Sequence, residues 1–323
     1  MALDIILLIV GTALLVKGAD WFVSGASAIA KALKIPSLII GLTLVSMGTS
    51  APEASVSVNS AINGMNDMSL GNVVGSNIFN TLLILGVSSL ILPLSIGKDI
   101  KRFDVPVMVC VYCVLLLFAF VITPLTLDIF ESVALLALFA GYTAFLIIRA
   151  RKTKTVTDTK DNNGGPSEKR EKKQKPLWLN IILAALGLAG IIFGGDLVVD
   201  SAASLAKTAG MSEQLVGLTI VAVGTSLPEL VTSVVASIKK ENDIAVGNVI
   251  GSNIFNVIFI LGLSSSISSL TLTPSALTDM LVMLGSGIAV LLVCLFSDKV
   301  RRPHGAVAVL FYVGYLVYII LRN

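Results

Sequence analysis

Long apolar runs, separated by short polar segments, fill most of the chain. A helix needs about 20 mostly apolar residues to cross a membrane. The pattern predicts ten such helices, at residues 3–30, 37–62, 68–92, 104–122, 126–148, 177–206, 212–238, 243–269, 274–297 and 304–321. We therefore expect an all-α polytopic membrane protein with ten transmembrane helices.

The composition restricts the class of protein further. Only 13% of the 323 residues are charged, about half the share in a soluble protein, and the mean hydropathy is +0.93. These values exclude a soluble globular enzyme and a disordered chain. The single histidine, His304, argues against Ser-His-Asp and Cys-His catalysis. No G-x-x-x-x-G-K-[ST] motif for nucleotide phosphates occurs. We expect no cofactor and no nucleic-acid partner.

A basic segment divides the chain into two parts, 1–148 and 177–323. Residues 149–176 contain ten Lys or Arg and four Asp or Glu, and they lack apolar periodicity. This composition predicts a flexible linker. With the N-terminus outside, 20 of the 23 Lys and Arg residues fall on the side of the linker. Because such residues concentrate in cytoplasmic loops, we expect a cytoplasmic linker and both termini outside.

An internal repeat relates the two parts. Residues 41–86 align without a gap with residues 217–262, at an offset of 176, and 26 of the 46 positions are identical. Two homologous parts of five helices each must enter the membrane from opposite sides, because five is odd. We therefore expect two inverted-topology repeats, with a binding site near the middle of the membrane where they meet.

Each repeat motif contains one glutamate in the middle of a predicted span, Glu53 and Glu229. An acidic side chain at this depth costs about 2.5–3.5 kcal/mol on insertion scales and normally has a partner. No Lys or Arg lies at comparable depth in either motif. A protonated, hydrogen-bonded carboxyl group is one interpretation, and a bound cation that supplies the missing positive charge is the other.

A proline precedes each glutamate, and a Gly-Thr-Ser sequence lies just before it. Pro52 and Pro228 each remove a helical hydrogen bond and crowd the carbonyl group four residues earlier. We expect the helices to loosen at 48–50 and 224–226, which frees backbone carbonyl groups. Such groups are tolerated inside a membrane only where they line a cavity or bind something. A simple proline kink is the alternative for either helix alone.

The helices that follow carry a second pair of polar positions. Ser76 and Asn80 lie four residues apart, as do Ser252 and Asn256, so each pair shares one helical face. Hydrogen bonding between helices is an alternative role for them. Asn77 and Asn253 project about 100° away and fit that role better. All these groups are oxygen donors, which hard cations prefer. Calcium takes 6–8 oxygens at about 2.3–2.6 Å.

The pairs GTSAPE with GNVVGSNIFN and GTSLPE with GNVIGSNIFN resemble the two repeat motifs of the calcium/cation antiporter superfamily, and most of all those of prokaryotic sodium/calcium exchangers. The resemblance implies exchange of Na⁺ for Ca²⁺ by alternating access in the inner membrane of a prokaryotic cell. It also implies that the first and sixth helices slide as a gate. The ions and the membrane lipid are the expected partners, without an obligate protein partner.

The resemblance further implies the roles of individual residues. Glu53 and Glu229 bridge calcium and sodium subsites, and the backbone carbonyls of Thr49 and Thr225 complete the calcium coordination. The implied sodium ligands and the residues that line the site are Ser50, Ser226, Ser76, Ser252, Asn80, Asn256 and the backbone oxygens of Ser46 and Ala222.

Three other functions stay open on the sequence alone. A Ca²⁺/H⁺ antiporter is the nearest alternative, because a glutamate pair also exchanges protons. A cation channel and an intramembrane enzyme are possible classes, but a channel needs no repeated broken helix and no catalytic motif supports an enzyme. We expect a secondary transporter and no enzymatic activity.

Overall fold

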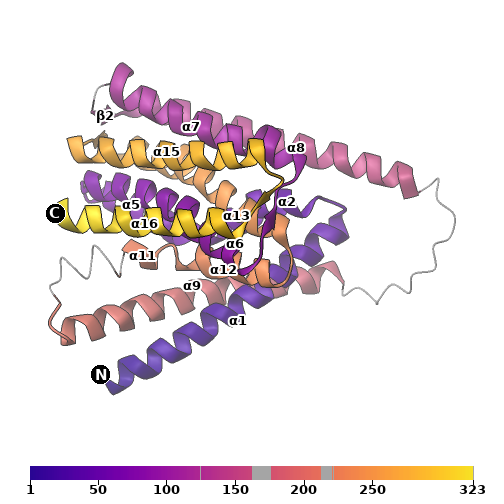
Figure 1. Ribbon diagram of the computed structural model, residues 1–323, viewed down its shortest axis with the longest axis horizontal. Helices are drawn as coiled ribbons and strands as arrows, with labels where there is room; N and C mark the ends of the chain where they lie inside the picture. The colour runs from indigo at the N-terminus through magenta and orange to yellow at the C-terminus, as the bar shows by residue number, and fades with distance from the viewer. Residues whose placement is uncertain (124, 162–175, 212–219, 221, 323) are drawn as a thin grey trace.

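The computed structural model describes residues 1–123, 125–161, 176–211, 220 and 222–322. The chain is mostly helical (Figure 1). Within the described residues, eight helices are long and apolar enough to cross a membrane: Ala2–Leu33, Asn66–Ile91, Ile100–Ile122, Ile129–Lys152, Leu177–Thr208, Asn242–Ile267, Ser275–Phe296 and Arg302–Arg322. The prediction of a polytopic helical membrane protein is therefore confirmed.

The other two predicted spans, 37–62 and 212–238, consist of short helices. The first contains α2 (Ser37–Ile40), the π-helix η1 (Gly41–Val45), α3 (Ser46–Thr49) and α4 (Ala51–Ile62). The second contains α11 (Ala222–Gly224) and α12 (Leu227–Ile238); residues 212–219 and 221 lie outside the described residues. Both segments are interrupted three residues before the glutamate of the repeat motif, at Ser50 and Ser226.

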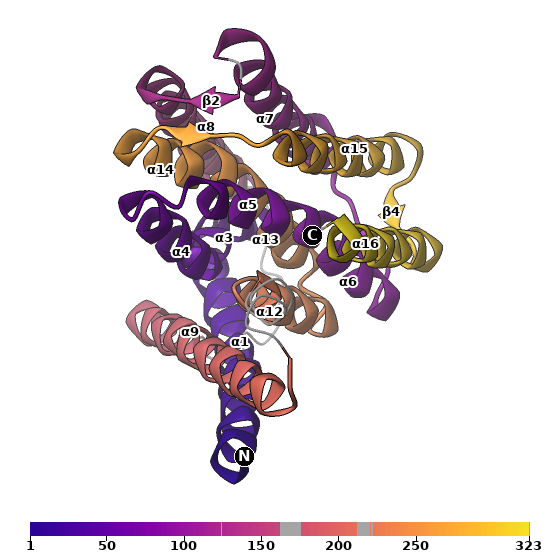
Figure 2. The same ribbon diagram turned by 90° about the vertical axis from the view of Figure 1, so that its left-hand side faces the viewer.

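Helices α1 (Ala2–Leu33) and α9 (Leu177–Thr208) lie together on one side of the molecule (Figure 2). They pack antiparallel, because Gly11 contacts Gly194 and Gly18 contacts Gly187. A Cβ atom on Gly18 would lie 2.7 Å from the carbonyl oxygen of Gly187. This close approach of two backbones is typical of small residues between membrane helices.

Two helices with π-helical segments form the centre of the molecule. The first is α5 (Asn66–Ile78), η2 (Phe79–Ile84) and α6 (Leu85–Ile91), and the second is α13 (Asn242–Phe255), η6 (Asn256–Leu261) and α14 (Gly262–Ile267). In their most apolar stretches 72% and 94% of the residues are buried. Gly247 and Gly251 lie against Leu38 and Leu42.

The remaining long helices are peripheral. They are η3 (Ile100–Asp104), α7 (Val105–Leu117) and η4 (Phe118–Ile122), followed by α8 (Ile129–Asp161), α15 (Pro274–Phe296) and α16 (Arg302–Arg322). Only 11% of the apolar stretch of α8, and of α16, is buried. Exposed side chains of the peripheral helices include Phe130 of α8 and Phe296 of α15. A surface so rich in large apolar side chains is suited to contact with lipid.

Four strands of two residues each correct the expectation of an all-α chain. β1 (Leu94–Ser95) pairs antiparallel with β4 (Lys299–Val300), and β2 (Thr126–Leu127) pairs with β3 (Leu270–Thr271). Each pair joins a connection of the first part to a connection of the second. Two-residue strands are too short to leave an alternating pattern in the sequence.

Helix α8 extends to Asp161 and so includes the first part of the expected flexible linker, residues 149–161. The linker residues 162–175 lie outside the described residues. The Ala, Arg and Lys residues that follow 148 favour helix. Adding residues to an existing helix avoids the unfavourable nucleation step, so a polar sequence can continue it.

The glycine contact between α1 and α9 generates a prediction about stability. We expect Gly18→Leu to separate the two helices and to lower the thermal unfolding temperature in detergent by several degrees, because its side chain would overlap the backbone of α9. Gly141→Leu in α8 is the matched control, since no described atom lies within 4 Å of a Cβ at Gly141. Equal unfolding temperatures for the two variants would contradict the packing.

Candidate functional site

The two helix breaks place the two glutamates. α3 ends at Thr49 and α4 begins at Ala51, with Ser50 between them at φ −82° and ψ 9°. Ser226 has nearly the same conformation, φ −91° and ψ 7°, between α11 and α12. The predicted loosening of both helices is confirmed. Glu53 and Glu229 lie in the first turns of α4 and α12, where the helix dipole favours a negative charge.

The serine at each break binds the glutamate of the other half. Ser226 Oγ donates to Glu53 Oε1 at 2.8 Å, and Ser50 Oγ donates to Glu229 Oε1 at 2.8 Å. These four side chains are completely buried. The bonds are equivalent under the 176-residue offset, so the two parts of the chain meet reciprocally at this point.

The central helices supply the next serine pair. Ser226 Oγ lies 3.1 Å from Ser76 Oγ, and Ser50 Oγ lies 3.0 Å from Ser252 Oγ. Ser252 Oγ in turn donates to the backbone oxygen of Ser46 at 3.4 Å. Hydrogen bonds thus connect Ser50, Ser226, Ser76, Ser252 and the backbone of Ser46 with the two glutamates.

Four asparagines lie where the central helices cross. Asn80 Nδ2 donates to Asn253 Oδ1, and Asn256 Nδ2 donates to Asn77 Oδ1, both at 3.1 Å. Asn77 Nδ2 also donates to the backbone oxygen of Asn253. The expected role of Asn77 and Asn253 in joining the helices is confirmed. The π-helices η2 and η6 include Asn80 and Asn256; such segments frequently occur at functional sites.

Four buried oxygens of the glutamates and asparagines have no hydrogen-bond partner within the described residues. They are Oε2 of Glu53, Oε2 of Glu229, Oδ1 of Asn80 and Oδ1 of Asn256. A buried acceptor without a partner costs about 1–3 kcal/mol, and more when it is charged. The two pairs are equivalent under the repeat offset. Acceptors left open in this paired arrangement point to a ligand that carries positive charge.

The threonines are held by a pair of residues that the sequence analysis did not select, Asn72 and Asn248. Thr49 Oγ1 donates to Asn248 Oδ1 at 3.0 Å, and Thr225 Oγ1 lies 3.4 Å from Asn72 Oδ1. Asn248 Nδ2 donates to Glu229 O, as Asn72 Nδ2 does to Glu53 O.

A sequence signal for these two asparagines was present. Asn72 lies four residues before Ser76, and Asn248 lies four residues before Ser252, so each extends the polar helical face by one turn. Their amide groups also donate to Ser57 and Ser233, both at 2.9 Å.

Of Ala222 only the backbone, at the start of α11, belongs to the described residues.

The chemistry of the site is that of oxygen ligands. Two carboxylates and four serine hydroxyls meet from the two halves, and two open carboxamide oxygens lie on the central helices, four residues after Ser76 and Ser252. No group of three or more His, Cys, Asp or Glu suited to a metal ion exists within the described residues. A set of neutral oxygens with two carboxylates fits hard cations and does not fit soft transition metals.

Comparison with known proteins gives a consistent result. A family model described as sodium/calcium exchanger protein matches residues 3–148 and 179–321. The chain is 36% identical over 326 residues to the putative antiporter CaxA of Alkalimonas amylolytica, with 98% of each chain covered. It is 37% identical over 330 residues to the inner membrane protein YrbG of Escherichia coli, covering 99% of this chain and 96% of the relative.

An archaeal relative and a solved structure extend the comparison. The chain is 32% identical over 347 residues to the sodium/calcium exchanger MaX1 of Methanosarcina acetivorans, with 98% of each covered. The structure of the sodium-calcium exchanger NCX_Mj soaked with 2.5 mM Na⁺ and 10 mM Sr²⁺ matches with a TM-score of 0.83 and 29% identity, over 98% of both chains.

The buried asparagine pair generates a prediction. Asn248→Leu removes the side-chain amide that accepts a hydrogen bond from the Thr49 hydroxyl and donates one to the Glu229 carbonyl. We therefore expect the unfolding free energy to fall by about 1–3 kcal/mol. Asn72→Leu should cost less, because Asn72 is only half-buried and its contact with Thr225 is longer. Thermal unfolding in detergent measures both, with the exposed Asn59→Leu as control. Equal losses at all three positions would contradict the assignment.

Proposed function

The chain belongs to the sodium/calcium exchanger protein family, and from this premise we propose that it is a secondary antiporter that exchanges Na⁺ for Ca²⁺ by alternating access. The sodium/calcium exchangers among its relatives, matched over nearly the full length, support the choice of ions. The function is transport, without an enzymatic reaction and without a cofactor; Ca²⁺ and Na⁺ are the cargo.

The four unpaired oxygens carry this proposal. Glu53 and Glu229 supply two negative charges, which balance one Ca²⁺ ion, and their second carboxylate oxygens are open. Oxygens of the two asparagines and of backbone carbonyls bring the number of ligands toward the 6–8 oxygens that calcium requires. A bound cation would satisfy acceptors that otherwise destabilise the fold.

We assign roles to the residues of the site on the same basis. Glu53 and Glu229 serve calcium and sodium in turn, and the backbone carbonyls of Thr49 and Thr225 complete the calcium coordination. Sodium ions use the hydroxyls and carbonyls close to the carboxylates, from Ser50, Ser226, Ser76, Ser252, Ser46 and Ala222, and Asn80 and Asn256 line the centre. Because two carboxylates cannot balance Ca²⁺ and several Na⁺ together, binding of one cargo displaces the other.

We also propose ten spans arranged as two inverted repeats, 1–148 and 177–323, joined by the linker 149–176 and containing the motifs 41–86 and 217–262. The equivalent helices α1 and α9 run antiparallel, which supports the inversion. The hydrogen bonds of the site recur at the repeat offset, which supports it too. The interrupted segments 37–62 and 212–238, the second and seventh in chain order, complete the ten spans.

The gate consists of α1 and α9 in this proposal. Lys239, at the end of α12, pairs with Asp20 of α1, and Glu241 accepts a hydrogen bond from Ser27 at 2.6 Å. The equivalents of Lys239 and Glu241 in the first half are Asn63 and Met65, which carry no charge. α1 is therefore bound by charged groups on one side of the molecule, as a gate that is closed on one side requires.

The membrane orientation is part of the proposal. The Lys and Arg distribution supports a cytoplasmic linker and two external termini in a prokaryotic inner membrane. α1 begins and α16 ends at the same end of the molecule (Figure 1), which agrees with an even number of spans. The relative from Escherichia coli is named an inner membrane protein. Lipid and the ions are the proposed partners.

Removal of one carboxylate tests the site. We expect Glu53→Gln and Glu229→Gln each to reduce ⁴⁵Ca²⁺ uptake into proteoliposomes more than tenfold, because one charge no longer balances a divalent cation. Glu131→Gln is the matched control: Glu131 is also buried but lies in α8, where it accepts from Asp128 N at 3.0 Å. Full transport by either site variant would refute the assignment.

The coupling ion is tested in the same vesicles. With the pH clamped, we expect an outward Na⁺ gradient to drive ⁴⁵Ca²⁺ uptake and a K⁺ gradient of the same size to drive none. In a separate measurement without Na⁺, we expect an imposed H⁺ gradient to drive none either. Uptake that follows the proton gradient and ignores Na⁺ would establish the Ca²⁺/H⁺ alternative instead.

A further inference from the structure

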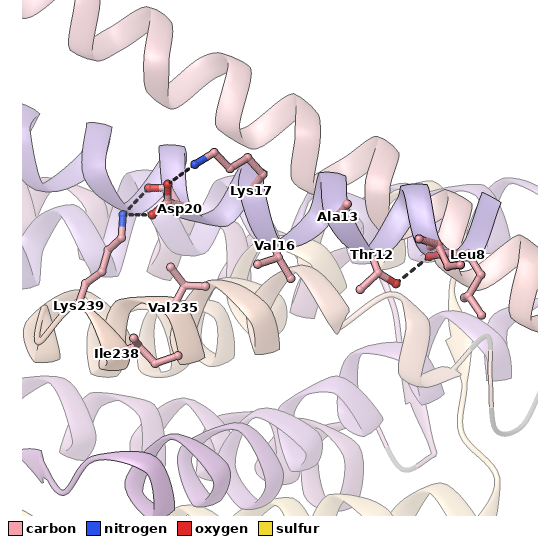
Figure 3. Close-up of a pocket in the computed structure, with 10 residues that line it drawn as sticks. Leu8, Thr12, Ala13, Val16, Lys17, Asp20, Val235, Ile238 and Lys239 are labelled. Carbon is pink, nitrogen blue, oxygen red and sulfur yellow. Dashed lines mark hydrogen bonds and ion pairs between the residues drawn. The ribbon is translucent and has the colours of Figure 1, made fainter. Parts of the chain in front are cut away.

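A groove of about 1080 Å³ lies between α1 and α12, away from the buried site. Six apolar side chains line most of it: Leu8, Ile9, Ala13, Val16, Val235 and Ile238. Three charged side chains, Lys17, Asp20 and Lys239, gather at one end, and the apolar residues continue from there along α1 (Figure 3).

The apolar part of the groove has the character and the length of a lipid contact. Ile9 and Ile238 are 64% and 63% exposed, which is unfavourable in water and favourable in hydrocarbon. The stretch of α1 from Leu8 to Asp20 is about 18 Å long at the rise of a helix. One leaflet of the hydrocarbon core is about 15 Å thick. An extended acyl chain therefore fits along the groove.

The charged end has a net positive charge. Lys239 Nζ pairs with Asp20 Oδ1 and also donates to Ser24 Oγ, and Lys17 Nζ pairs with Asp20 Oδ2 at 3.1 Å. Two ammonium groups against one carboxylate leave one positive charge. The Lys17 side chain is 62% exposed, and within the described residues its one hydrogen bond goes to Asp20.

Two features support a membrane surface at this end of the groove, although α1 itself continues to Leu33. Lys239 directly follows the last residue of α12, and the next residues, Lys240 and Glu241 and then Asn242 and Asp243 at the start of α13, are polar. Trp21 is 40% exposed, and its ring centroid lies 5.8 Å from Lys17 Nζ. Tryptophan beside lysine is typical of the level of lipid headgroups.

We propose that this groove binds one anionic phospholipid molecule, with an acyl chain along α1 and its phosphate group at Lys17 and Lys239. A zwitterionic lipid offers the same acyl chain, but its own ammonium group opposes the positive end of the groove. The positive charge therefore selects an anionic headgroup.

The positive charge at the end of the groove is not repeated at the equivalent positions of the other half. The positions equivalent to Lys17, Asp20 and Lys239 in the other pair of elements are Phe193, Asp196 and Asn63, which together carry one negative charge. The surface equivalent to the groove would repel an anionic headgroup. We therefore infer a single phospholipid site, on one side of the molecule.

Tryptophan fluorescence tests the site directly. The chain has two tryptophans, so Trp178→Phe leaves Trp21, beside the charged end, as the only emitter. The variant is reconstituted into phosphatidylcholine vesicles that contain phosphatidylglycerol, with bromine quenchers on the chains of either lipid. We expect phosphatidylglycerol to bind at Trp21 about fivefold more strongly than phosphatidylcholine.

Charge variants locate the phosphate. We expect Lys17→Gln or Lys239→Gln to reduce the fivefold preference to about one, and Lys240→Gln, an exposed neighbour outside the groove, to leave it unchanged. Continued quenching by brominated phosphatidylcholine shows that a variant keeps Trp21 at the lipid surface. Equal quenching by both lipids in the parent, or a preference that persists in both charge variants, would overturn the proposal.

Discussion

Two carboxylates buried at the meeting point of the two halves are the constraint on which the rest of this structure depends. Glu53 and Glu229 are completely inaccessible to solvent, and no ion pair of either is present within the described residues. Each has only one of its oxygens bound by a serine of the opposite half. In the function that we propose, both carboxylates are ionised and a cation balances their two negative charges. The surrounding elements supply the remaining conditions for holding it.

The interrupted helices are one of these conditions. The breaks at Ser50 and Ser226 put both glutamates at helix N-termini, where backbone dipoles favour anions. The same breaks turn the serine hydroxyls across the interface between the halves. The central helices close the site, because their asparagines bind one another with their amide groups and leave two carboxamide oxygens open. The carboxylates therefore come from α4 and α12, and the open carboxamide oxygens come from the central helices. The complete set of oxygens exists only in the folded protein.

Much of this arrangement was predictable from the sequence, for identifiable reasons. The Gly-Thr-Ser-x-Pro-Glu order predicted both breaks, because proline inside a helix removes a hydrogen bond and is tolerated in a first turn. The structure places Pro52 and Pro228 in the first turns of α4 and α12. The four-residue spacing of Ser76 and Asn80 predicted that they share one helical face. In the structure Ser76 contacts Ser226, which binds Glu53, and Asn80 binds Asn253 of the opposite central helix. The assignment of individual ion ligands rests on more than spacing and stays a prediction.

Other features depend on tertiary contacts and left little or no pattern. The two-residue strands exist only because connections from the two halves meet, and the π-helical turns at Asn80 and Asn256 have no propensity signal. The helical continuation of α8 to Asp161 was missed because a polar composition was taken for a flexible one. Asn72 and Asn248 were missed although their spacing was regular, since their partners lie on separate elements.

The most direct test of the central claim is a crystal structure of the protein soaked in Ca²⁺, with the ion located by its anomalous scattering. The account predicts one Ca²⁺ within about 2.3–2.6 Å of carboxylate oxygens from both Glu53 and Glu229. A calcium ion bound elsewhere, with the two carboxylates hydrogen-bonded to each other through a shared proton, would contradict it.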